Sequence, residues 1–162
     1  MRTHARTLAP ACLAVLLVAP TAVSCGGDED EKIDACALLA QADAEAIFGG
    51  AATPDQGAPV TDPNYLGECL WSHDTMTTGS LLALYVWKGA QYYNPPPPAQ
   101  PFAIGEMGAV AADDSAGVDI EWVQDGRTYV LSYFTTGPGA PAETAAAEQV
   151  KALALQISMA AP

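Results

Sequence analysis

The sequence predicts an α+β domain in which an antiparallel β-sheet of four to five strands carries an N-terminal and a C-terminal helix on one face. Apolar residues recur at helical spacing over 34–50 and again from 141 to about 159. Residues 80–88 are apolar on both faces, as in a central strand. An Asp-Gly dipeptide at 125–126 divides two alternating segments and predicts a hairpin. A chain of 162 residues is long enough for one such domain.

The first 24 residues form a predicted signal peptide. Arg2, His4 and Arg6 give a positive start, and an apolar run over 8–20 follows. This run is shorter than the about 20 apolar residues that span a bilayer. The layout is typical of a cleaved export signal. No twin arginine precedes the run, so the general secretion route is expected.

Cys25 is the predicted point of attachment to a membrane. The small and apolar residues 22–24 precede it and resemble the lipobox of bacterial lipoproteins, although Ala22 stands where leucine is usual. In such proteins the cysteine thiol receives a diacylglyceryl group, and the cysteine becomes the first residue of the mature chain. Residues 25–33 then form the lipidated cysteine and a flexible, acidic tether. The alternative is an ordinary cleavage site with Cys25 in a disulfide.

The other cysteines predict one disulfide. Cys12 leaves with the signal, so Cys36 and Cys69 remain as a pair in an oxidising compartment. A bridge between them would close a loop of about 33 residues and contribute roughly 3 to 4 kcal/mol in the chain-entropy model. A metal pair is the weaker alternative, because the mature sequence has no CxxC motif and a single histidine, His73. We therefore expect no metal ion and no cofactor.

Residues 34–160 form the predicted globular domain, which begins with a helix over 34–50. Asp34 and Asp43 are candidate N-caps, and a bend or break is expected near Gln41. Prolines and glycines predict a loop over 51–67. The strand expected over 68–73 places Cys69 and Trp71 on the face toward the helix. The prolines of 94–101 exclude both strand and helix and predict a stiff, extended loop.

The Asp-Gly turn sets the register of the hairpin over 118–134. One face is apolar and pairs Trp122 with Tyr129, Ile120 with Leu131 and Val118 with Tyr133. The other face carries the polar residues Asp119, Glu121, Thr128 and Ser132.

The C-terminal helix is expected to open at Pro141 and to reach about Met159. Its apolar stripe consists of Ala146, Val150, Leu153 and Ile157.

Short motifs of the chain, "DACALLAQADAEAIFGG", "CLW" and "AIGEMGAVA", give it a resemblance to a family of small bacterial envelope lipoproteins that carry a domain of unknown function. The positions that match are Cys36, Cys69, Trp71, Gly105 and Glu106. The resemblance covers most of 34–157 and implies an anchored domain. It implies no reaction, because the family offers no catalytic residues to carry over.

Two candidate sites have weak support in the sequence. His73 and Asp74 are adjacent, but neighbouring residues on a strand point apart and no GxSxG nucleophile motif is present, so a catalytic pair is not expected. The carboxylates within 113–121 suggest calcium, but their spacing is not that of an EF-hand. A solvated acidic turn is the preferred interpretation.

The favoured binding surface is aromatic. Trp87, Tyr92 and Tyr93 lie beside the proline run, and both tyrosines fall outside the predicted strand. Aromatic rings next to prolines suit a glycan or a peptide. The alternative is that these rings cover their own loop.

Charge excludes some partners. Loss of Arg2 and Arg6 with the signal would take the formal net charge from -13 to -15, which disfavours nucleic acid. We therefore expect a secreted, lipid-anchored protein of the cell envelope that binds another envelope protein, a glycan or a small ligand and is not an enzyme. The alternative is a small extracytoplasmic enzyme, or a subunit or inhibitor of one.

Overall fold

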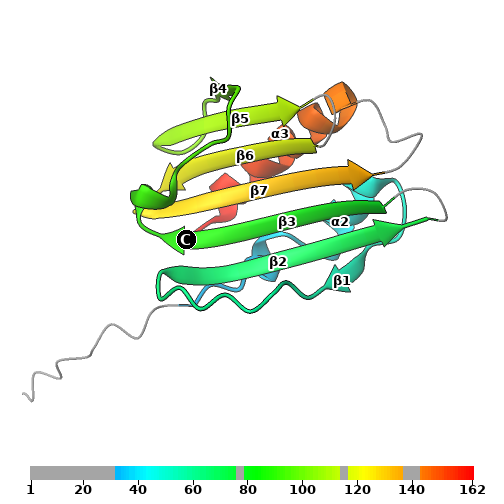
Figure 1. The fold of residues 1–162 in the computed structure, drawn as a ribbon, viewed down its shortest axis with the longest axis horizontal. Helices are drawn as coiled ribbons and strands as arrows, with labels where there is room; N and C mark the ends of the chain where they lie inside the picture. The colour runs from blue at the N-terminus through cyan, green and yellow to red at the C-terminus, as the bar shows by residue number, and fades with distance from the viewer. Residues whose placement is uncertain (1–31, 76–78, 114–116, 137–142) are drawn as a thin grey trace, which may run out of the picture.

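The computed structural model describes residues 32–75, 79–113, 117–136 and 143–162, which form an α+β domain around one antiparallel sheet. The sheet has seven strands in the order β1-β2-β3-β7-β6-β5-β4 (Figure 1). Four of them were expected: β2 (Tyr65–Asp74), β3 (Gly79–Lys88), β6 (Gly117–Gln124) and β7 (Arg127–Thr136). The expected number of four to five strands is therefore too low.

The additional strands are β1 (Thr53–Asp55), β4 (Ala99–Pro101) and β5 (Met107–Asp113). β1 and β4 lie within segments that were predicted to be loops, and the exclusion of strand from 94–101 is wrong at its last three residues. Both strands are at the sheet edges and contain a proline, Pro54 or Pro101. A proline is tolerated at an edge because its missing N–H is not needed by a further strand.

The hairpin of β6 and β7 has the predicted register. Trp122 pairs with Tyr129, Ile120 with Leu131 and Val118 with Tyr133. Asp125 and Gly126 both have positive φ, 50° and 71°, as a two-residue turn of this kind requires. β7 then pairs with β3 over ten residues, so the two central strands join the two halves of the sheet.

The predicted N-terminal helix is broken, as expected near Gln41, into α1 (Ala35–Leu38) and α2 (Gln41–Phe48). Asp34 Oδ1 accepts hydrogen bonds from the N–H groups of Cys36 and Ala37 and caps α1. Asp43 Oδ2 accepts one from the N–H of Ala40 at the start of α2. Gly49 ends α2 with a left-handed φ of 67°.

The C-terminal helix α3 spans Glu143–Ala160, and the predicted opening residue Pro141 lies outside the described residues. All four residues of its predicted apolar stripe are buried. α1, α2 and α3 pack on the same face of the sheet, behind the strands in Figure 1. Between 32 and 162, no described helix is both long and apolar enough to cross a membrane.

The core lies between these helices and the sheet. Trp122 and Tyr129 are fully buried with their rings stacked at 5.1 Å, and Ile157 of α3 is buried in the same cluster. The opposite face of the sheet, which we call the open face, carries none of the described α-helices (Figure 1). Any site on this face is therefore built on a rigid, well-packed sheet.

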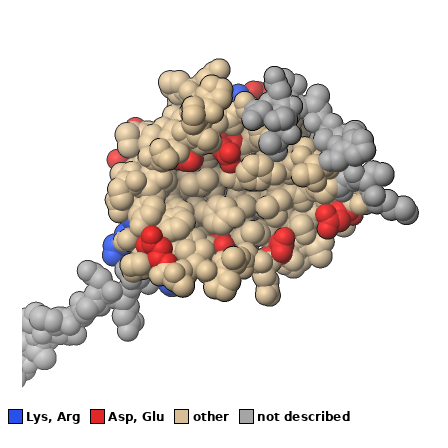
Figure 2. All heavy atoms as spheres, in the orientation of Figure 1, with Lys and Arg blue, Asp and Glu red and all other residues tan. Residues whose placement is uncertain are grey.

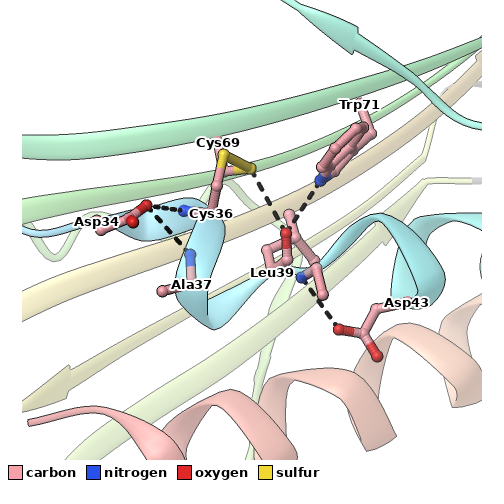
Figure 3. Close-up of a disulfide and its surroundings, with 8 residues drawn as sticks. Asp34, Cys36, Ala37, Leu39, Asp43, Cys69 and Trp71 are labelled. Atoms are coloured by element: carbon pink, nitrogen blue, oxygen red, sulfur yellow. Dashed lines mark hydrogen bonds between the residues drawn. A yellow bond between two sulfur atoms is a disulfide. The ribbon is translucent and has the colours of Figure 1, made fainter.

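A disulfide joins Cys36 of α1 to Cys69 of β2, as predicted (Figure 3). Its Cα atoms are 4.9 Å apart. Beside it, Trp71 Nε1 donates a 3.0 Å hydrogen bond to the carbonyl oxygen of Leu39, in the break between α1 and α2. The carbonyl that the helix break leaves without a helical partner is thus bound by β2.

Candidate functional site

The predicted aromatic surface lies at one end of the open face. Trp87 is at the end of β3, and Tyr92 follows it in the short 3-10 helix η1 (Ala90–Tyr92). Their rings are stacked with centroids 4.8 Å apart. Tyr65 of β2 also packs edge-on against Trp87, with the ring centroids 4.9 Å apart. The structure therefore brings Trp87 and Tyr92 together, and their ring faces contact each other.

The hydroxyl of Tyr92 is held by the 56–64 loop. It donates to the carboxylate of Asp62, 3.0 Å from Oδ2, and accepts a 2.9 Å hydrogen bond from Nδ2 of Asn64. The N–H of Asn64 lowers the pKa of Asp62, while burial and Asp62 raise the pKa of Tyr92. These contacts fit the alternative in which the rings cover their own loop. Tyr93 follows η1 and is half-buried.

η1 and the proline-rich segment after it cross the open face in front of β6 and β5 (Figure 1). This segment buries the polar face of the hairpin: Glu121 is 7% exposed, and Thr128 and Ser132 are also buried. The N–H of Asn94 donates a 2.8 Å hydrogen bond to Glu121 Oε2, and Thr128 Oγ1 donates to the carbonyl of Gly89. The prediction of a solvated acidic turn within 113–121 is therefore wrong at Glu121.

Burial raises the pKa of Glu121, against the opposing effect of the Asn94 N–H, and nearby Asp119 raises it further. Asp119 itself accepts a short hydrogen bond from Ser132 Oγ. The proline-rich segment thus keeps the Glu121 carboxylate away from solvent. The Asp119 carboxylate lies beside the part of the open face that this segment does not cover.

Two hollows meet at Phe134 on the open face. The first, of about 200 Å³, lies between the proline run and the sheet and is lined by Pro97, Asp119 and Phe134 among others. The second, of about 380 Å³, is lined by Asp55, Asp74 and Phe134 with residues of β2, β3 and β7. We call the two together the Phe134 trough.

Phe134 is 37% exposed, although phenylalanine is among the residues most often fully buried. It is paired with Leu81 of β3 on one side and with Gly117 of β6 on the other. Gly117 also lines the first hollow and has no side chain that could cover the ring. Tyr133 was predicted to lie in the core, whereas no role was predicted for Phe134. Its position on the polar side of the alternating pattern was the available signal.

Charge is unevenly distributed over this face. Figure 2 shows Asp and Glu atoms on both sides of an uncharged floor, and Lys and Arg atoms at the margins. Neither hollow is lined by Lys, Arg or His among the described residues. The trough is therefore negatively charged over an apolar floor.

His73 and Asp74 are placed on opposite faces, as adjacent strand residues must be. The imidazole of His73 stacks on Phe48 of α2 at 5.7 Å, and its Nδ1 is 2.7 Å from the carbonyl oxygen of Ala51. Asp74 lines the trough. His73 thus has a packing partner and a backbone partner on the helix side, away from the trough.

A metal site has little support in the described part of the chain, which contains no group of three or more His, Cys, Asp or Glu side chains arranged to hold an ion. Of the acidic residues considered for calcium, Asp114 and the side chain of Asp113 lie outside the described residues. The predicted lipid attachment at Cys25 and the signal over 1–24 lie outside them too.

No protein-family model, curated protein or solved structure matches this chain. The resemblance to small envelope lipoproteins therefore stays a prediction.

Proposed function

We propose that this chain is a lipid-anchored protein of the bacterial cell envelope whose single domain binds a ligand on the open face of its sheet and is not an enzyme. The observation that supports binding most directly is the Phe134 trough, a hollow, apolar and acidic surface on the face that the described helices leave uncovered. Support for the anchor comes from the signal and Cys25 in the sequence.

In this proposal, the helix face of the sheet stabilises the fold and the open face binds the ligand. The helix face is closed by α1, α2, α3 and the disulfide, so it stabilises the fold. The open face exposes Phe134 and the carboxylates of Asp55 and Asp74. Exposed aromatic rings with a few polar groups around them are typical of binding surfaces.

The chemistry of the trough favours binding over catalysis. A hydrolase of the serine type needs a base beside its nucleophile. Ser132 Oγ instead donates to Asp119, and His73 is engaged on the opposite side of the sheet. The polar groups that line the trough suit recognition of a charged partner.

Site-specific photocrosslinking in the native host tests the proposed binding face. A photoreactive phenylalanine analogue replaces Phe134 in the full-length chain, and the same analogue at Leu155 of α3 serves as the matched control. The two positions are 37% and 40% exposed, and they lie on opposite sides of the sheet. We expect a discrete crosslinked product from position 134 and none from 155. Equal products from both positions, or none from 134, would contradict the proposed face.

A further inference from the structure

The Phe134 trough combines an apolar floor with carboxylates on two sides. Strand register places Leu81, Phe134 and Gly117 side by side across β3, β7 and β6. Asp119 lies on the β6 side and lines the first hollow, while Asp55 and Asp74 line the second. The acidic groups are therefore separated by the ring of Phe134.

We propose that this trough binds a short, extended, basic segment of another protein. The segment lies across β7 and β3, with one positive side chain at Asp119 and others at Asp55 and Asp74. This inference rests on the proposed binding at the open face and adds the chemical class of the partner.

Charge complementarity is the first reason. The mature chain predicted from Cys25 has nineteen carboxylates and four basic residues. Three of the four lie away from the trough. Lys88 of β3 and Arg127 of β7 are opposite each other in the strand register, at the far end of the central strands. Lys32 Nζ donates to the carbonyl oxygen of Tyr65 at the same end. Lys151 of α3 binds Glu148. A basic partner would thus supply the counter-charge that the described lining of the trough lacks.

Phe134 is the second reason. A ring with 37% exposure that lines both hollows is accessible to a Lys or Arg side chain, whose methylene groups can pack on it and whose cation is attracted to an aromatic ring face. A nearby carboxylate can then pair with the same cation. A neutral glycan could use the ring and donate hydroxyl hydrogen bonds to the carboxylates, but it would supply no positive charge to balance them.

The sheet edges argue for binding on the face. A peptide could otherwise add a strand at β1 or β4, but each edge strand has only three residues and contains a proline. A segment that crosses the trough needs no backbone pairing with the sheet. The trough recognises such a segment through the charged and apolar side chains of the segment.

The test uses the full-length protein in an uncharged detergent and two labelled hexapeptides. One alternates lysine with leucine, and the other has glutamine in place of lysine. Fluorescence anisotropy measures the dissociation constant of each. We expect the lysine peptide to bind at least tenfold more tightly than the glutamine peptide, and to bind less tightly as salt rises.

Two variants locate the binding. Asp119→Asn keeps an acceptor for Ser132 Oγ, and Phe134→Ala removes the exposed ring; each is expected to weaken the lysine peptide about fivefold. Glu148→Gln removes the same charge from the helix side and is expected to change the affinity less than twofold. Matching unfolding curves check that the variants fold.

Equal affinity for both peptides, equal weakening by Asp119→Asn and Glu148→Gln, or no binding of the lysine peptide would each overturn the inference. The same holds if a free polyamine competes fully for the trough while the peptide does not bind, because the ligand would then be a small amine. If position 134 crosslinks in cells but the lysine peptide fails, the binding face stands and the basic partner does not.

Discussion

Glu121 is the residue whose surroundings differ most from what its sequence neighbourhood suggests. Alternation places it correctly on the polar side of β6, where solvent was expected. The cover comes from Asn94, a residue 27 positions earlier in the chain, whose N–H binds its carboxylate. Burial by a residue so distant in the chain cannot be predicted from the local alternation of polar and apolar residues. The same is true of Tyr92, whose hydroxyl partner Asp62 lies 30 positions away.

The raised pKa of Glu121 predicts a pH-dependent effect of Glu121→Gln on stability. Because burial raises the pKa of Glu121, the folded chain keeps its proton to a higher pH than the unfolded chain does. The free energy of unfolding of the wild type therefore falls as pH rises from the ordinary glutamate pKa through the raised one. The glutamine side chain of the variant carries no charge at any of these pH values, and its carbonyl oxygen can still accept from the Asn94 N–H.

We expect Glu121→Gln to match the wild type at about pH 4, below both pKa values, and to become progressively more stable than it toward about pH 8. Urea unfolding at several pH values measures the difference. The control, Glu148→Gln, alters a glutamate whose side chain is 75% exposed and should show no such trend. A constant difference between Glu121→Gln and the wild type would contradict burial of the ionised group.

At the level of elements, the sequence predicts those strands that have a strong local signal. The β6–β7 hairpin combines a specific turn with alternating large apolar residues, so even its register can be predicted. β5, with the sequence MGAVAAD, is rich in alanine and glycine, which have low strand propensity. β1 and β4 are three residues long and contain proline. These strands form because a paired neighbour is available, which is tertiary information.

The link between α1 and β2 gives the prediction at this scale. α1 has only four residues, too few to be stable alone, and the disulfide holds it against the sheet. We expect the double variant Cys36→Ala, Cys69→Ala to lose roughly 3 to 4 kcal/mol of unfolding free energy, since 33 positions separate the two cysteines.

Urea unfolding with and without reductant checks this prediction. The reductant should destabilise the wild type by a similar amount and leave the double variant unchanged. Trp71→Phe is the companion variant, because it removes the hydrogen bond to Leu39 together with part of a ring that packs against the core, and it should cost at least about 1 kcal/mol. An equally stable double variant would mean that packing alone holds α1 in place.

For the molecule as a whole, the proposed anchor and the fold constrain each other. Lys32, where the described chain begins, lies seven positions after Cys25, so the two ends of this tether can be at most about 25 Å apart. Lys32, Lys88 and Arg127 lie at this end of the sheet. The Phe134 trough is at the opposite end of the same strands. A lipid on Cys25 would therefore hold the trough away from the bilayer, where a partner in the envelope can reach it.

Cys25→Ala tests this arrangement in the native host. The wild type is expected in the membrane fraction, with residues 1–24 removed and the mass of the acyl chains added, because two or more chains anchor a protein stably. The variant lacks the sulfur that accepts the lipid and should appear in the soluble extracytoplasmic fraction, or uncleaved in the membrane. Its purified domain should still unfold with the same reductant-sensitive transition, since Cys25 is not part of the Cys36–Cys69 bridge. A wild-type chain that is cut at another site and carries no lipid would contradict the anchor. The crosslinking and peptide measurements would still test the trough and its basic partner, because neither depends on the lipid.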